Sequence, residues 1–274
     1  MRNLFIIFSS IAIGGCGTNN NPLPNQVLLY GHGGGGFDNS ALFAPNSVPS
    51  MKESIEKYQL DGIEVDVQFT KDTGLIVFHD GYLESATQCK GKINAIHLKD
   101  AAGCYFRDQF YNKYSAQVIT FDSLVTLMNT VWMDKYLSIN LQSNFDVPYK
   151  KDSLAHYFHE KMTAFKSLDK ITIECNDANF LYFLERENKE YKSYLIANID
   201  SKSANEVYRF KLDGIVSFFE NRDDIIEKDL TDSGKVIFIY GAKLPSDYAK
   251  YNYTYVTAMQ VDNPVVALKF FRNQ

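Results

Sequence analysis

Hydrophobic and polar residues alternate along this chain with two different spacings, which indicate strands and helices. Residues 62–69 place apolar side chains at the odd positions, with Glu64, Asp66 and a glutamine at even ones, as in a strand with one polar face. Residues 48–58 carry apolar side chains three and four positions apart, which predicts a helix. Ser50 and Glu53 are placed to form a capping box near its start.

The same two patterns alternate through the rest of the chain. A tight turn at 71–74 leads into a hairpin return at 75–78, and eight further runs have the character of strands. We expect these strands at 27–30, 62–69, 136–141, 170–174, 194–197, 214–217, 236–240 and 254–259. We expect helices at 48–58, 121–131, 153–165, 178–187, 203–210 and 223–228. This order favours an α/β fold, a (β/α)8 barrel of the TIM type with a β-hairpin and loop insertion after the second strand. A six-stranded open sheet is the alternative.

The N-terminal segment has the pattern of an export signal. A short basic start precedes an apolar run at 4–13, which is too short for the roughly 20 residues of a membrane-spanning helix. Gly14-Gly15-Cys16 resembles the lipobox of bacterial lipoproteins, in which the cysteine is diacylated, and two acyl chains suffice for stable anchoring. A plain secretory signal with an incidental cysteine is the alternative. We therefore expect a signal peptide at 1–15, a lipidated Cys16 with a tether at 16–25, and one barrel domain at 26–274. The protein would be a membrane-anchored lipoprotein of the bacterial cell envelope, periplasmic or surface-facing.

Composition and charge narrow the function classes. With 28 Lys and Arg against 33 Asp and Glu, the 274-residue chain has a formal net charge of −5. This acidity argues against a nucleic-acid partner, which would call for a basic patch. The 45% hydrophobic content is that of a globular domain, and we expect a monomer.

Three cysteines remain after Cys16. Cys89 and Cys104 lie in one polar, loop-like stretch, so in an oxidising compartment a disulfide between them is expected. Cys175 follows a strand-like run and is expected to be a buried free thiol. No pair has the CxxC spacing of a zinc site.

Candidate chemistry lies at the ends of the predicted strands, where barrels carry their sites. His32 follows the first strand, Glu64 and Asp66 share one face of the second, and His79 follows the hairpin return. A carboxylate pair at this spacing is also common on a solvated strand face. Inside a barrel the two acids would repel each other, and a hard divalent cation, Ca²⁺ or Mg²⁺, would offset that cost. The histidines are suited to act as general acid and base.

These residues together resemble a known family, the glycerophosphodiester phosphodiesterases. The resemblance is strongest in five stretches, Gly31-His32-Gly33, 62–68, 70–72, 77–80 and 87–93, with weaker similarity at 120–124 and 261–264. It implies a barrel that cleaves a phosphodiester with the help of a divalent metal ion. His32 and His79 match the acid and base of the family, and Glu64 and Asp66 match its acidic metal ligands.

Four positions depart from the family pattern. Gly33 stands where the family usually has arginine, and residues 44–47 lack the glutamate of its Pro-Glu-Asn-Thr stretch. Asn140 and Gln142 stand where it has glutamate and lysine, so Asn140 would serve as a metal ligand through its carbonyl oxygen, with Gly33 and Gln142 at substrate-binding positions. The related sphingomyelinase D-type phospholipases also lack the arginine and that first glutamate, and retain the histidines and the acid pair.

Two functions follow from this. The first is a metal-dependent phosphoric diester hydrolase for glycerophosphodiesters or related lipid head groups, with a histidine pair as general acid and base. The second is a catalytically degenerate barrel that binds a phosphorylated ligand or a partner without turnover.

Overall fold

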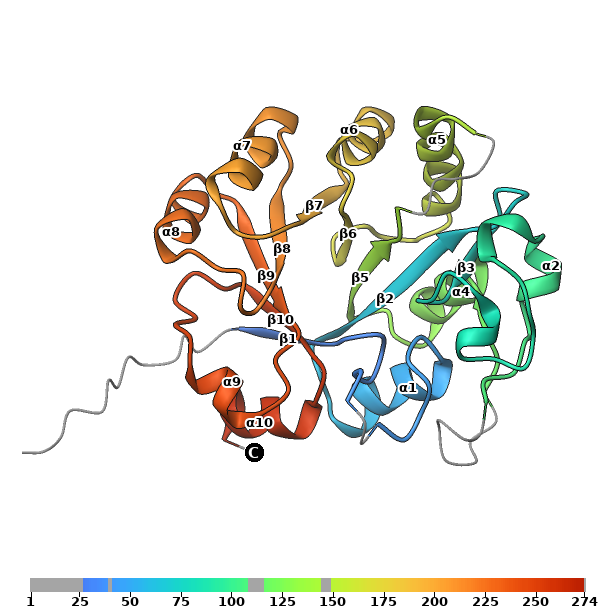
Figure 1. Ribbon diagram of the computed structural model, residues 1–274, viewed down its shortest axis with the longest axis horizontal. Coiled ribbons are helices and arrows are strands. Elements are labelled where there is room, and N and C mark those ends of the chain that lie inside the picture. The colour runs from blue at the N-terminus through green and yellow to red at the C-terminus, as the bar shows by residue number, and fades with distance from the viewer. Residues whose placement is uncertain (1–26, 39–40, 108–115, 144–148, 274) are drawn as a thin grey trace, which may run out of the picture.

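The sequence folds into a closed barrel of eight parallel strands (Figure 1). The computed structural model describes residues 27–38, 41–107, 116–143 and 149–273. The barrel strands are β1 (Leu28–Gly31), β2 (Gly62–Phe69), β5 (Tyr136–Leu141), β6 (Ile171–Cys175), β7 (Lys192–Ile196), β8 (Gly214–Phe218), β9 (Val236–Tyr240) and β10 (Ala258–Val261). β1 pairs with β10 on one side and β2 on the other, which closes the barrel. The predicted (β/α)8 fold is confirmed, and the open six-stranded sheet is wrong.

Helices cover the outside of the barrel (Figure 1). They are α1 (Val48–Lys52), α4 (Phe121–Thr130), α5 (Lys151–Met162), α6 (Ala178–Glu187), α7 (Ser201–Phe210), α8 (Asp224–Asp232), α9 (Pro245–Ala249) and α10 (Pro264–Arg272). α6 has the predicted bounds, whereas α9 and α10 have no counterpart in the sequence prediction. No helix in the described ranges is long and apolar enough to cross a bilayer.

Two details of the prediction are wrong for local reasons. Helix α1 begins at Val48 as predicted, but the capping box at Ser50 does not form, because Ser47 is the N-cap and its Oγ accepts the Ser50 N–H at 3.3 Å. After α1 the backbone continues as one π-helical turn, η1 (Glu53–Lys57). The last strand starts at Ala258 rather than at 254, since the backbone N–H of Thr254 is bonded to the Asn252 side chain in a turn.

An insertion after β2 carries the hairpin return. β3 (Leu75–Val77) runs antiparallel to β2, and β4 (Ile119–Thr120) pairs with β3. Between them lie the short helices η2 (Leu83–Ser85), η3 (Ile93–Ala95) and α2 (Leu98–Ala101), and a disulfide joins Cys89 to Cys104. The insertion has a small core of its own, which includes Phe78, Leu83 and Phe106. Cys175, in contrast, is a buried free thiol at the end of β6.

The two faces of the barrel sheet carry different residues, because side chains alternate along a strand. Most odd-numbered strand residues are apolar and pack under the helices, as Ile63, Ile139 and Ile239 do. Even-numbered residues point inward. Their lower layers form an aromatic plug, with the ring centroid of Tyr30 5.4 Å from that of Phe238. Above the plug, towards the carboxyl ends of the strands, the inward residues are polar.

Opening the Cys89–Cys104 disulfide is expected to loosen the insertion. The bridge closes a loop of 15 residues, for which the loss of unfolded-state entropy amounts to about 3 kcal/mol as an upper figure. A Cys89→Ser, Cys104→Ser double variant should therefore unfold at lower urea concentration than the wild type in oxidising buffer. Dithiothreitol should reproduce the loss in the wild type and leave the double variant unchanged. Equal unfolding midpoints for the two proteins would contradict this.

Candidate active site

A cavity of about 200 Å³ opens at the carboxyl ends of the barrel strands. Its lining comes from several strands and from the hairpin return, and comprises His32, Phe37, Asp66, His79, Asn140, Glu174, Ile196, Tyr240 and Gln260. The fold therefore gathers both predicted histidines with Asp66 and Asn140. Glu174, on the strand that follows Asn140, reaches the cavity as well, and Phe37, Tyr240 and Gln260 join them without having been predicted as site residues.

His32 is held by a buried acid from the other end of the chain. Its Nδ1 lies 2.7 Å from Asp262 Oδ1, just after β10, and the Phe37 N–H donates to the same oxygen at 3.2 Å. Because a carboxylate only accepts, Nδ1 donates in this contact, and in the tautomer that this selects Nε2 is the free acceptor. His32 Nε2 is 3.9 Å from Glu64 Oε2. Asp262 thus orients the imidazole.

His79 is exposed, and its ring also packs beside Phe37. The ring centroid of Phe37 is 4.7 Å from that of His32 and 5.3 Å from that of His79. His79 Nδ1 lies 2.9 Å from Asp80 Oδ1, and this hydrogen bond raises the pKa of His79 above its ordinary value, against the effect of burial. Gln68 Nε2 lies 2.7 to 3.0 Å from the carbonyl oxygens of residues 78, 79 and 80, which fixes the hairpin return on the barrel.

Two carboxyl groups of the barrel interior are pushed towards their neutral form. Glu64 accepts the Gly33 N–H at 2.7 Å through Oε2, while its buried Oε1 has no hydrogen-bond partner in the described part of the chain. Burial, and then the charges of Asp66 and Glu174, raise the pKa of Glu64 well above its ordinary value. Glu174 accepts hydrogen bonds from Ser138 and, at 2.5 Å, from Gln260, yet burial raises its pKa to about 7.

Asp66 is surrounded by side-chain amides. Asn46 donates to Oδ2 at 2.8 Å, and its own Oδ1 accepts the Asp66 backbone N–H at 2.8 Å. Asn140 and Gln142 both donate to Oδ1, at 3.0 and 2.7 Å. These three residues are called the amide clamp below. Asp66 therefore receives three N–H donors on its carboxylate, and only 1% of the residue is exposed.

Gly33 and Gln142 act on the acids and are absent from the cavity lining. Gly33 has φ +56°, and a Cβ there would lie 2.6 Å from the Phe37 ring, so no larger side chain fits while Phe37 occupies this place. Gly33 holds Glu64, and Gln142 holds Asp66. Both residues thus support the acids, and the substrate contact expected of them from the sequence stays a prediction.

The side chains present do not fit a divalent cation. Calcium takes six to eight oxygen ligands and magnesium six. The Asp66 oxygens already accept three amide N–H groups, which leaves Glu64 Oε1 as the one carboxylate oxygen shown above to be unpaired. Within the described ranges, no three His, Cys, Asp or Glu side chains are grouped as metal ligands. The Ca²⁺ or Mg²⁺ expected at Glu64, Asp66 and Asn140 therefore does not find its usual set of oxygen ligands in these side chains.

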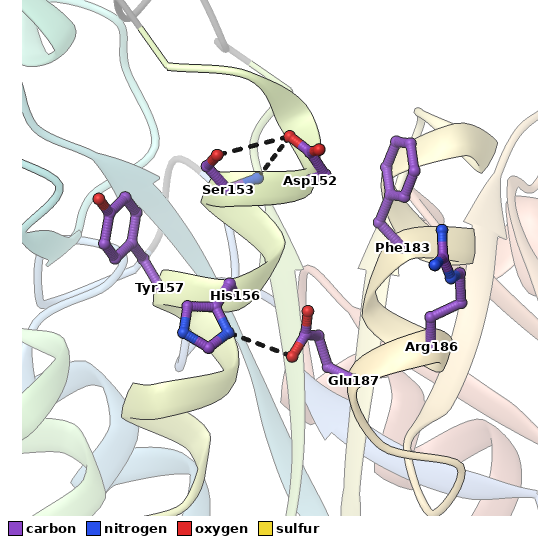
Figure 2. A pocket seen from close by; sticks show the side chains of 7 residues that line it. All are labelled: Asp152, Ser153, His156, Tyr157, Phe183, Arg186 and Glu187. Carbon is purple, nitrogen blue, oxygen red and sulfur yellow. Dashed lines mark hydrogen bonds and ion pairs between the residues drawn. The ribbon is translucent and has the colours of Figure 1, made fainter.

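A larger groove of about 460 Å³ lies outside the barrel between α5 and α6 (Figure 2). His156 from α5 meets Glu187 from α6 there, with Nδ1 3.2 Å from Oε2, and Asp152 accepts the N–H of its neighbour Ser153. Residues of these two helices form its lining, and its one histidine is paired with Glu187. The mouth of the barrel, where two histidines and several buried acids converge, is the better candidate.

Comparison with known proteins identifies the family. The family model of the glycerophosphoryl diester phosphodiesterase family matches residues 36–266. The chain belongs to this family. A glycerophosphodiester phosphodiesterase of Bacillus subtilis (strain 168) is 30% identical over 100 residues, which span 35% of this chain and 32% of that protein. The match thus covers about a third of this relative's length.

Solved structures of this family share the barrel. A phosphodiesterase of Oleispira antarctica, in complex with the product sn-glycerol-3-phosphate, matches with a TM-score of 0.75 at 15% identity, over 91% of this chain and 98% of its own. A glycerophosphodiester phosphodiesterase from Parabacteroides distasonis ATCC 8503 matches with a TM-score of 0.75 at 16% identity, over 90% and 98%. The resemblance seen in the sequence is thereby confirmed for the family and the fold.

The raised pKa of Glu174 predicts how stability depends on pH. Between the ordinary value of 4.5 and about 7, the folded protein keeps a proton that the unfolded chain has lost, so stability falls as pH rises through this window. Glu174→Gln removes the ionisation and keeps an acceptor for Ser138 and Gln260. The variant should gain roughly 1–3 kcal/mol over the wild type at pH 8 and little at pH 4.

Urea unfolding at the two pH values measures this difference. Glu160→Gln, on the exposed surface of α5, is the control and should follow the wild type. Some dependence on pH should persist in Glu174→Gln, because Glu64 contributes with the same sign. If the free energy of unfolding of the wild type changed with pH by the same amount as that of Glu174→Gln, Glu174 would not keep its proton in the folded protein.

Proposed function

We propose that the barrel mouth hydrolyses phosphodiesters, with glycerophosphodiesters or related lipid head-group diesters as substrates. The observation that carries this proposal is the pair of histidines at the cavity, each bonded to its own carboxylate and each with its ring beside that of Phe37, in a chain of this family. The Oleispira neighbour, whose bound product is sn-glycerol-3-phosphate, supports a small phosphorylated ligand.

The hydrogen bonds of the histidines suggest their roles. Asp262 accepts a hydrogen bond from Nδ1–H of His32, so Nε2 can accept a proton from the attacking oxygen of water or of a neighbouring glycerol hydroxyl. The hydrogen bond that His79 donates to Asp80 favours the protonated form of His79, which can then protonate the departing alcohol. One phosphorus–oxygen bond forms as the other breaks, and a hydroxyl nucleophile would give a cyclic phosphate as the first product.

Binding without turnover is the second candidate, and one observation favours it. None of the described residues that line the cavity is Lys or Arg, so the side chains there offer a phosphate few positive charges. The nearby Lys243 is turned to Asp262, with Nζ 4.0 Å from Oδ2. A degenerate site would retain the cavity and bind the ligand without hydrolysing it.

Replacing the histidines tests the hydrolase. His32→Ala and His79→Ala should each lower turnover by about 10²- to 10⁴-fold, since each removes one proton-transfer group. Asp262→Asn should lower it as well, because an amide can donate to Nδ1 and select the wrong tautomer of His32. Release of glycerol phosphate from a panel of glycerophosphodiesters, with Ca²⁺, Mg²⁺ or chelator, measures the rates.

His156→Ala, in the outer groove, is the matched control and should keep full activity. If the wild type hydrolyses no diester faster than a variant that carries both His32→Ala and His79→Ala, the hydrolase is excluded. Binding without turnover is then the remaining candidate function.

We propose further that the protein is a lipoprotein of the cell envelope. Residues 1–26, including Cys16, lie outside the described part of the chain, so this rests on the sequence pattern alone. A Cys16→Ser variant should no longer be acylated and should move from the membrane fraction to the soluble fraction of cells. Persistence of the variant in the membrane fraction would contradict lipid anchoring.

A further inference from the structure

The amide clamp on Asp66 has a consequence for how the cavity binds its ligand. We infer that Asn46, Asn140 and Gln142 take the place of a divalent cation at Asp66, and that the amide of Asn140 is a hydrogen-bond donor to the phosphoryl group. The site would then bind its phosphodiester without Ca²⁺ or Mg²⁺. This inference rests on the proposed function, and it departs from the metal dependence implied by the family resemblance.

The orientation of the clamp follows from its partners. Asn46 must direct its oxygen at the Asp66 backbone N–H, which leaves its NH₂ group for Oδ2. Asn140 and Gln142 approach Oδ1 at 3.0 and 2.7 Å, and an amide oxygen at such a distance would repel the carboxylate. All three side chains therefore present N–H groups.

The clamp also removes the reason for a cation. A buried carboxylate is costly unless paired, and hydrogen bonds to an ionised acceptor are stronger than neutral ones. Asp66 receives two donors on Oδ1 and one on Oδ2, while its neighbour Glu64 is shifted towards the neutral acid. A metal ion would have to displace these donors to reach Asp66.

Asn140 is the member of the clamp that reaches the cavity. In the sheet it pairs with Asp66 on β2 and with Glu174 on β6, and it lines the cavity beside both. One N–H of its NH₂ group is bonded to Asp66, which holds the amide in place and leaves the second N–H for a ligand. A donor fixed in this way stabilises developing negative charge without reorganisation.

Asn140→Asp tests the inference, because it keeps the size of the side chain, removes the donor and adds a carboxylate beside Asp66. We expect the thermal unfolding temperature of the wild type to be the same in millimolar Ca²⁺, Mg²⁺ or EDTA. The variant should unfold at a lower temperature in EDTA and regain several degrees with Ca²⁺, because the enlarged acid cluster then needs a cation. Asn176→Asp, exposed directly after β6, is the control and should show no cation dependence.

Calorimetry with sn-glycerol-3-phosphate in EDTA tests the donor itself. Wild type should bind it, and Asn140→Ala, which adds no charge, should bind about tenfold more weakly, as expected for one hydrogen bond to an anion. A rise in the wild-type unfolding temperature with Ca²⁺ or Mg²⁺, or equal affinities of wild type and Asn140→Ala, would overturn the inference.

These readouts separate the inference from the hydrolase. Suppose that the unfolding temperature of the wild type is independent of cations and that Asn140→Ala binds sn-glycerol-3-phosphate more weakly. The inference about the amide clamp is then supported even if no diester is cleaved, and only the proposed hydrolysis is contradicted. Turnover that survives EDTA supports both, whereas turnover abolished by EDTA in the wild type overturns the inference and leaves a metal-dependent hydrolase.

Discussion

The burial of acidic side chains inside the barrel is the constraint that organises this site. Glu64, Asp66 and Glu174 are almost wholly inaccessible, and the described residues that line the cavity include no Lys or Arg. Ionised carboxylates in such a place repel one another and lose hydration, so each must either be protonated or receive hydrogen bonds. Glu64 and Glu174 are shifted towards the neutral acid, and Asp66 is covered by amide donors. Gly33, Ser138 and Gln260 contribute further hydrogen bonds to these acids.

The alternation of side chains along the strands brings the acids there. Because even-numbered strand residues point inward on every barrel strand, a polar residue at an even position near a carboxyl end enters the mouth. The aromatic plug around Tyr30 and Phe238 fills the lower layers, which confines polar chemistry to the upper ones. The insertion adds His79 from outside the barrel, and Gln68, also at an even position, ties that segment down.

Much of this was predictable from local sequence, and the failures share one cause. The alternation at 62–69 and the helix at 178–187 are local patterns, and both have the predicted bounds. Asp262 was missed as a partner of His32 because the contact spans 230 positions, which no local pattern records. The last strand was placed too early, since the β-branched and aromatic residues at 254–257 are typical of a strand although Thr254 lies in a turn.

The neutral residues at the barrel mouth have a different meaning in the sequence and in the folded structure. Along the sequence, Asn140 and Gln142 are separate losses of charge from the family pattern, and each on its own argues for a degenerate site. In the fold they converge with Asn46 on one carboxylate. An acid that lost its cation alone would be left buried and unpaired, at a cost of several kcal/mol. Three amides on that acid restore its hydrogen bonds and leave one donor beside the cavity, so the substitutions are best understood together, as one exchange of ionic for amide coordination.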